Sequence, residues 1–136
     1  MEKINIIGAG ISGLAAAIRL AEAGRPCRLI SSLPSERAQS VLAEGGINAA
    51  LDTMGEEDTV REHFDDTMKG GCYLEDPDTV RGLTGAAPGI VKDLVSLGVP
   101  FRQEGGKLIL RNFGGQKKKR TAKSSQSSSR DSRKFS

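Results

Sequence analysis

Residues 4–31 read INIIGAGISGLAAAIRLAEAGRPCRLIS, and this stretch decides the fold. A short, mostly β-branched run over residues 3–7 is typical of a buried strand. The Ala- and Leu-rich segment Leu14–Ala23 predicts a helix that the following glycine closes. Cys27–Ser31 predicts a second strand, and strand, helix and strand in this order form a βαβ unit with parallel strands. The predicted fold class is therefore α/β, with a Rossmann-like unit at its start.

The turn between the first strand and the helix, Gly8-Ala9-Gly10-Ile11-Ser12-Gly13, has the spacing GxGxxG. In this context the first glycine makes a tight turn, the second lets the backbone approach a pyrophosphate, and the third lets the helix pack closely on the strand. The helix N-terminus adds free N–H groups and the positive end of the helix dipole. We therefore predict that this turn binds the phosphates of a dinucleotide; a glycine-rich turn without a ligand is the alternative.

The end of the second strand lacks the acidic residue that binds the ribose hydroxyls in standard NAD sites. Ser31 and Ser32 stand there, and Glu36 comes a few residues late. NAD binding in its standard form is therefore disfavoured, although serine hydroxyls can hydrogen-bond a ribose. In the long connection that follows, residues 43–50 (AEGGINAA) combine small side chains with a glycine pair. Such backbone can lie against a flat ring, but an ordinary flexible loop fits the composition equally well.

Two later segments have helical patterns with recognisable starts. Asp58 is placed to cap a helix over residues 59–69, which a glycine pair ends. Asp76-Pro77 begins another helix, because proline is favoured at the first helical position. Pro88 is expected to interrupt it and to start a separate helix over residues 89–97.

The last third of the chain predicts a hairpin and then a polar tail. Gly105-Gly106 is the expected turn, with residues 108–110 as the return strand. Residues 117–136 hold eight basic residues, one acidic residue and seven serines, so the net charge of +3 describes an acidic body with a basic tail. Such a segment buries too little apolar surface to offset its ordering entropy. We therefore expect residues 1–116 to form part of a folded domain and residues 117–136 to be disordered.

Composition excludes several classes of protein. The chain has 136 residues, which is one domain at most, and no apolar run reaches the roughly 20 residues of a membrane span. Cys27 and Cys72 form no CxxC pair, so we expect two free thiols in a reducing, cytoplasmic compartment. With one histidine and no His/Cys cluster, we expect no metal site.

Other charged residues receive ordinary interpretations. His63 stands on a predicted helix beside acidic residues and is expected to be a solvated surface group. The acidic residues 56–58 and 65–66 are expected to help the helix N-terminus and solubility. Lys117–Arg120 could bind nucleic acid or an anionic surface, but no aromatic residues interleave it, so we expect no nucleic-acid partner.

Five motifs together carry a resemblance to a known family. They are, in order, GAGISG at 8–13, RAQSVLAEGGINAAL at 37–51, HFDDTMKG at 63–70, GVPF at 98–101 and RNFGGQ at 111–116. In this order they resemble the N-terminal part of the flavoprotein subunit of fumarate reductase and succinate dehydrogenase, over residues 3–122. L-aspartate oxidase shares much of the pattern and is the nearest alternative. The elements FGGQ and INAAL favour the fumarate and succinate branch.

The resemblance implies an incomplete FAD-binding domain from an oxidoreductase that passes hydride between flavin N5 and a C4 dicarboxylate, fumarate or succinate. The family's cofactor-binding positions fall in three groups. They are Gly8, Ala9, Gly10, Ser12 and Gly13 at the pyrophosphate, Ser31 and Ser32 near the adenosine ribose, and Ser40, Ala43, Glu44, Gly45 and Gly46 along the isoalloxazine. Phe113 would lie near the dicarboxylate pocket. In the family, the basic run 117–120 belongs to the folded enzyme.

Two residues depart from the commonest family pattern. Many members carry a histidine where this chain has Gln39, and that histidine bonds covalently to the flavin. Glutamine is no nucleophile, so we expect non-covalent FAD with a lower potential. Fumarate reductases tend to carry a glutamate at the position of Glu44, where succinate dehydrogenases carry glutamine. A carboxylate there disfavours the anionic reduced flavin, so both positions favour fumarate reduction.

The family's later motifs, which supply the catalytic arginine and the residues that clamp the carboxylates, do not occur. We therefore expect a truncated or frame-shifted product that is inactive alone, with no catalytic residue of its own. The full enzyme would receive electrons from an iron–sulfur subunit or a soluble donor and could be membrane-associated through partner subunits. A non-catalytic FAD-binding module is the remaining alternative.

Overall fold

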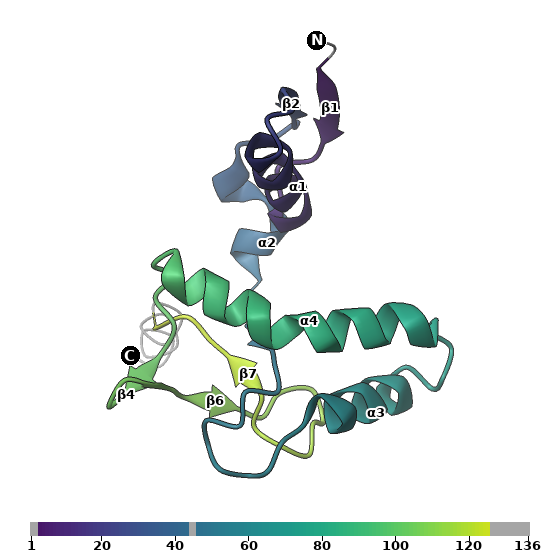
Figure 1. Ribbon diagram of the computed structural model, residues 1–136, viewed down its shortest axis with the longest axis vertical. Coiled ribbons are helices and arrows are strands. Elements are labelled where there is room, and N and C mark those ends of the chain that lie inside the picture. The colour runs from purple at the N-terminus through teal and green to yellow at the C-terminus, as the bar shows by residue number, and fades with distance from the viewer. Residues whose placement is uncertain (1–2, 44–45, 126–136) are drawn as a thin grey trace, which may run out of the picture. The chain divides into compact units, whose positions relative to one another are not determined.

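The N-terminal residues form the strand–helix–strand arrangement that the sequence predicts. In the computed structural model, which describes residues 3–43 and 46–125, β1 (Ile4–Ile7), α1 (Ile11–Glu22) and β2 (Cys27–Ile30) follow one another (Figure 1). The two strands pair in parallel, with Ile4 opposite Cys27. The chain divides into two units, Met1–Glu44 and Gly45–Ser136, which we call the N-terminal and C-terminal units.

Helix α1 begins one turn earlier than the composition predicted, at Ile11 instead of Leu14. Gly10 has extended backbone angles and is the N-cap, and the N–H of Leu14 already donates to its carbonyl at 3.0 Å. The glycine-rich turn therefore supplies the first helical turn. The predicted end is confirmed, because Gly24 takes the left-handed conformation (φ +64°) directly after the helix.

The N-terminal unit has little interior. Ala9 is the only buried residue among those of residues 3–43 whose burial the structure describes, and α1 contributes none. Large apolar side chains on all three elements are exposed, including Ile7 (88%) and Ile18 (54%). The unit continues through the short helices η1 (Ser35–Arg37) and α2 (Gln39–Leu42). Its apolar surface is therefore not covered by the described residues.

Two helices form one layer of the C-terminal unit, α3 (Val60–Gly70) and α4 (Pro77–Ser96), and they pack against each other (Figure 1). α4 starts at Pro77 as predicted, and Asp76 caps it, since its carboxylate accepts from the N–H of Thr79 at 2.9 Å. The cap predicted for α3 is wrong by one residue. Thr59 is the N-cap, and its hydroxyl accepts from the N–H of Glu62 at 3.1 Å.

The predicted helix break at Pro88 is also wrong, because α4 runs through this residue without interruption. Proline removes one backbone hydrogen bond and crowds the preceding turn, which costs about 3 kcal/mol. The buried face of α4 continues on both sides of the proline, with Thr84 and Ala87 before it and Val91 after it. Burial of this continuous face offsets the local cost.

The strands of the C-terminal unit are short. β3 (Ile47–Asn48), β7 (Thr121–Ala122) and β6 (Leu110–Arg111) form an antiparallel sheet in that order. β4 (Gln103–Glu104) and β5 (Lys107–Leu108) form the predicted hairpin about Gly105-Gly106, whose φ values of +55° and +77° suit such a turn. The predicted return strand 108–110 is divided, because Leu110 leaves the hairpin and enters the other sheet.

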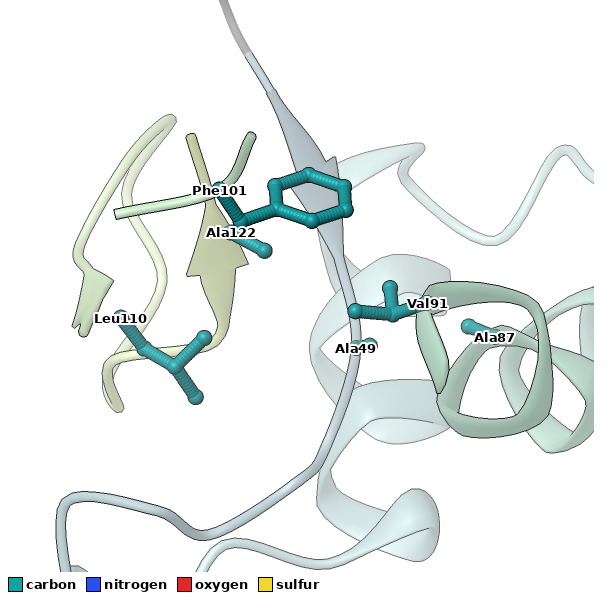
Figure 2. Packing of buried hydrophobic residues seen from close by; sticks show 6 residues of the cluster. All are labelled: Ala49, Ala87, Val91, Phe101, Leu110 and Ala122. Atoms are coloured by element: carbon teal, nitrogen blue, oxygen red, sulfur yellow. The ribbon is translucent and has the colours of Figure 1, made fainter. Parts of the chain in front are cut away.

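The core of the C-terminal unit lies between α4 and the three-stranded sheet. Its buried members are Ala49, Ala87, Val91, Phe101, Leu110 and Ala122 (Figure 2). Val91 lies beside Ala49, and Phe101 lies beside Ala122 (Figure 2). Partly buried aliphatic residues from neighbouring segments surround this group. An aliphatic core with a single buried aromatic agrees with the low aromatic content of the sequence.

Residues 117–125 are folded, so the disordered segment predicted from Lys117 onward does not begin there. They contain β7, and Arg120, Thr121 and Ala122 are all buried. The prediction from composition failed because the basic side chains of this stretch pair with acidic side chains of the same unit, as described below. Residues 126–136 lie outside the described residues. Within residues 3–43 and 46–125, no helix is both long enough and apolar enough to span a bilayer.

Candidate functional site

The glycine-rich turn Gly8–Gly13 of the N-terminal unit, which the sequence predicts to bind phosphates, is called the phosphate loop after that prediction, and its backbone is tightly constrained. Gly8 has φ +110°, a conformation that other residues rarely adopt, and its N–H donates to the carbonyl of Ile30 at 2.8 Å. This bond ties the end of β1 to the end of β2. A side-chain carbon on Gly13 would overlap the carbonyl of Gly8. The helix can therefore approach the strand this closely only with glycine at this position.

The N-terminus of α1 presents N–H groups without a competing acidic residue. Gly10 has no side-chain cap, and the first turn contains no carboxylate. The N–H of Ile11 donates to the hydroxyl of Ser40 at 3.2 Å. A side-chain carbon on Gly10 would lie 3.1 Å from that hydroxyl. The arrangement therefore brings Ser40 to the phosphate loop and leaves a positive dipole end beside it.

The other predicted residues of the N-terminal unit lie at the surface. Ser31 and Ser32 follow β2 directly and are exposed, and the Ser31 hydroxyl accepts from the N–H of Leu33 at 3.5 Å. Ala43 caps the end of α2 and is exposed. Glu44 and Gly45 lie outside the described residues. Roles of these residues toward a ribose or a flavin stay predictions.

Gly46 and Phe113 belong to the C-terminal unit. Gly46 has φ +94°, and a side-chain carbon there would overlap the carbonyl of Ala122. The segment after it is held by β7, since the N–H of Ala49 donates to the carbonyl of Arg120 at 2.7 Å. Phe113 is 60% exposed. Its predicted place near a dicarboxylate is not tested by this exposure.

Sequence reasoning missed a buried ion-pair cluster in the C-terminal unit. Arg120 is fully buried and donates to both carboxylate oxygens of Asp58, from Nε at 3.1 Å and from Nη2 at 2.7 Å. Its Nη1 lies 3.2 Å from the carboxylate of Asp66. The prediction that residue 58 caps a helix is therefore wrong; its carboxylate neutralises a buried guanidinium.

The three lysines before this arginine face acidic residues as well. Lys117 lies 3.9 Å from Asp66, Lys118 lies 3.2 Å from Glu62, and Lys119 lies 2.9 Å from Glu56. The hydrogen bonds and charge from Lys119 hold the pKa of the Glu56 carboxyl below its ordinary value. The acidic residues around the start of α3 are thus partners of the basic run. One signal in the sequence agreed with this, the resemblance that assigned residues 117–120 to the folded enzyme.

His63 is buried, with 4% of its surface exposed, so the expectation of a solvated surface group is wrong. Burial lowers the pKa of its imidazole, and the nearby guanidinium of Arg120 lowers that pKa further. The Nδ1 atom of His63 has no hydrogen-bond partner among the described residues. His63 lines a cavity of about 470 Å³ that lies wholly within the C-terminal unit. Across the part of the chain that the structure describes, no three His, Cys, Asp or Glu side chains gather as metal ligands.

Comparison with protein families gives one match that spans nearly the whole chain. The model of the FAD binding domain matches residues 4–133. Among curated proteins, the chain is 45% identical over 120 residues to the succinate dehydrogenase flavoprotein subunit of Bacillus subtilis, which covers 88% of this chain. It is 42% identical over 118 residues to one subunit of the fumarate reductase (CoM/CoB) of Methanothermobacter marburgensis, which covers 85% of this chain.

Comparison with solved structures finds enzymes of the same two kinds, from other organisms. The Mycobacterium smegmatis Sdh1 complex in its apo form matches with a TM-score of 0.85 and 33% identity over 90% of this chain. A variant of the E. coli quinol fumarate reductase matches with a TM-score of 0.82 and 35% identity over 88% of this chain. The chain spans about a fifth of the length of these relatives, 20% of the Bacillus subtilis protein and 21% of the Mycobacterium smegmatis chain.

Proposed function

Because the chain belongs to the family of FAD-binding domains, we propose that it supplies the FAD-binding loop of a flavoprotein of the succinate dehydrogenase and fumarate reductase type. One observation carries the cofactor part of this proposal. The Gly8–Gly13 turn leaves no room for a side chain at Gly13, and it presents a helix N-terminus whose first N–H is bound by the Ser40 hydroxyl and which has no carboxylate in its first turn. The proposed reaction rests on the names of the relatives, which are a succinate dehydrogenase and a fumarate reductase subunit and not an L-aspartate oxidase.

The residues of the phosphate loop fit the pyrophosphate of FAD. Gly8, Ala9, Gly10, Ser12 and Gly13 would surround it, with backbone N–H groups of α1 as donors. Ser31 and Ser32, exposed at the end of β2, would hydrogen-bond the adenosine ribose through their hydroxyls. The N-terminal unit would then be the first part of a Rossmann-like domain.

The flavin ring would be bound by small residues that follow the phosphate loop in the sequence. They are Ser40, Ala43, Glu44, Gly45 and Gly46. When bound, FAD would supply two-electron hydride chemistry toward a C4 dicarboxylate such as fumarate or succinate. Ser40 would orient the start of α1 through its bond to Ile11, and Phe113 would offer an exposed apolar face to the substrate. No residue of this chain is proposed to move a proton in the reaction.

We propose that FAD binds non-covalently. Gln39 is the first residue of α2 and is exposed, and its amide has no nucleophilic atom for the flavin. Acid precipitation of the FAD-loaded chain should therefore leave all flavin in the supernatant. Flavin that stays with the precipitated protein would contradict this part of the proposal.

Glu44 is proposed to favour fumarate reduction. Its carboxylate would repel the anionic reduced flavin and lower the flavin potential. In a longer flavoprotein that carries this sequence, Glu44→Gln should raise the potential measured by spectroelectrochemistry. A flavin potential that stays the same or falls would contradict the proposal that Glu44 favours fumarate reduction.

The wider setting follows from what the relatives are called. Their names describe subunits, so we propose a partner, either an iron–sulfur protein or a soluble electron donor. The enzyme would work in the cytoplasm, with membrane association only through such partners. The chain by itself should not reduce fumarate, because it spans about a fifth of these relatives. Fumarate reduction by the purified chain would contradict this statement.

The direct test is FAD binding by the full chain, followed by quenching of flavin fluorescence. Gly13→Ala should abolish binding, since its side-chain carbon would overlap the carbonyl of Gly8. Gly82→Ala in α4 is the matched control, because a side-chain carbon there meets open space. Equal affinity of the two variants would overturn the proposed loop. Loss of binding in Gly13→Ala with no substrate turnover by any longer form would leave the non-catalytic module as the function.

A further inference from the structure

The cavity of the C-terminal unit is lined mainly by groups that attract anions. Its wall comes from α3, from the turn at Gly114-Gly115 and from the segment that leads into β7. Three cationic side chains line it, Lys69, Lys117 and Arg120, whereas Asp66 is its one carboxylate. The amide side chains of Asn48 and Gln116 also line it.

Two buried polar side chains on this wall have atoms that the described residues leave without hydrogen-bond partners. One is Nδ1 of His63, in a residue that is 4% exposed, and the other is Nη1 of Arg120, in a residue that is fully buried. Two other donors of the guanidinium are used, because Nε and Nη2 each donate one hydrogen bond to Asp58. Buried polar atoms are normally satisfied, so Nη1 of Arg120 lacks an acceptor, and Nδ1 of His63 lacks an acceptor or a donor according to which ring nitrogen carries the proton.

Asp66 does not supply that acceptor fully. Its Oδ2 atom is 3.2 Å from Nη1 of Arg120 but lies outside hydrogen-bond geometry, and Oδ2 is itself without a hydrogen-bond partner among the described residues. Lys117 approaches the other oxygen at 3.9 Å. This contact reduces the electrostatic cost of burying the guanidinium. It leaves the N–H groups of Nη1 available to a ligand.

We propose that this cavity binds a small oxyanion, either a carboxylate or a phosphate group, between His63, Arg120 and the ammonium groups of Lys69 and Lys117. The cavity volume of about 470 Å³ exceeds the roughly 30 Å³ that one water occupies in the liquid, so an ion with several oxygens fits together with water. All residues that line this cavity belong to the C-terminal unit.

The groups that face His63 predict how binding couples to pH. They are Arg120 from the segment before β7, Asp58 from the segment before α3, and Asp66 from α3 itself. Burial and the guanidinium keep the pKa of the imidazole below its ordinary value. A bound oxyanion places negative charge beside the ring, which favours the protonated form. Anion binding should therefore raise the pKa of His63, and affinity should rise as pH falls.

The experiment uses the fact that His63 is the only histidine of the chain. Its imidazole gives one set of resonances in the isotope-labelled, full-length chain, so a shift reports on this cavity alone. Sodium phosphate and sodium acetate are titrated separately, each against sodium chloride at the same ionic strength. We expect a saturable shift with at least one oxyanion and an upward shift in the pKa of His63 on its addition. Phosphate alone would indicate a tetrahedral ligand, and acetate alone a planar carboxylate.

Variants separate this site from general salt effects. The double variant Lys69→Gln with Lys117→Gln should weaken the affinity about tenfold, a moderate effect because both cations are exposed to solvent. Lys107→Gln on the β4–β5 hairpin removes one exposed charge away from the cavity wall and should leave the affinity unchanged. A non-saturable shift, an equal shift with chloride, or an affinity that the double variant does not change would overturn the proposal.

Discussion

The two units of this chain differ, because one carries the glycine-rich motif and the other carries most of the buried core. The N-terminal unit contains the phosphate loop, but its helix α1 buries no residue and Ile7 is 88% exposed. The C-terminal unit has a closed core around Val91 and a fully buried guanidinium at Arg120. The unit that carries the clearest motif is therefore the one with the least apolar burial.

This difference shows that a recognisable motif and a self-sufficient fold are separate properties. The phosphate loop depends on local backbone geometry, which three glycines set within six residues. Stability depends on apolar area removed from water, and α1 and β2 retain much of theirs on the surface. Exposed apolar surface of this kind promotes association, so we expect the N-terminal unit to cause aggregation of the isolated chain.

The largest decrease in the free energy of unfolding is expected when the buried ion pair of the C-terminal unit is removed. Arg120→Met would leave Asp58 buried without its partner, which should lower the free energy of unfolding by about 3–5 kcal/mol. Arg111→Met in β6 is the control, because its exposed side chain should change that free energy by at most about 0.5 kcal/mol. Urea unfolding followed by circular dichroism measures both. An equal decrease in the free energy of unfolding in both variants would show that the buried ion pair contributes no more stability than an exposed arginine.

A pair of aliphatic truncations tests the contrast between the units directly. Val91→Ala removes buried apolar volume from the core and should cost about 1.5–3 kcal/mol of unfolding free energy. Ile18→Ala in α1 should change it by at most about 0.5 kcal/mol, because Ile18 is 54% exposed and alanine favours helices. The same urea titration compares them. A larger loss for Ile18→Ala would mean that the N-terminal unit has a core of its own.

A smaller effect is expected at the start of α4. Asp76→Ala removes the acceptor of the Thr79 N–H and should lower the free energy of unfolding by less than Val91→Ala does. Hydrogen bonds from the side chain and then the backbone of Thr79 hold the pKa of Asp76 below its ordinary value of 3.8. The stabilisation is therefore present above pH 3.8 and is lost as pH falls through the lower folded-state pKa. A variant with unchanged stability at pH 7 would show that the cap contributes nothing.

The smallest expected effect is a pH dependence from His63. Its folded-state pKa lies below the ordinary value of 6.5, so the unfolded state takes up a proton first as pH falls. Stability should be constant just above pH 6.5 and should decrease below it. His63→Gln should remove this decrease below pH 6.5 in the same unfolding assay. An identical pH profile in both proteins would contradict the burial of this imidazole.

Local features of this fold could be predicted from the sequence. The βαβ order, the glycine that ends α1, the helix start at Pro77 and the turn at Gly105-Gly106 all follow from residues that lie next to one another. Each depends on backbone angles or short hydrogen bonds within a few positions. The turn between β1 and α1 is also local, because its glycines lie within six residues, but its binding of phosphates stays a prediction.

Long-range features were not predictable in the same way. Asp58 and Arg120 lie 62 positions apart, and no periodicity links them. Composition marked residues 117–125 as disordered because it counted their charges without their partners. It also could not show that the buried face of α4 continues past Pro88. Each error came from packing or charge pairing that only the folded C-terminal unit supplies.

The proposed binding of FAD by the glycine-rich turn can be examined residue by residue. Backbone amide resonances of the isotope-labelled full chain are followed during an FAD titration. The largest shifts are expected at Gly10, Ile11, Ser12 and Gly13, at the start of α1. Unchanged resonances at these four residues, with or without shifts elsewhere, would contradict the proposed binding.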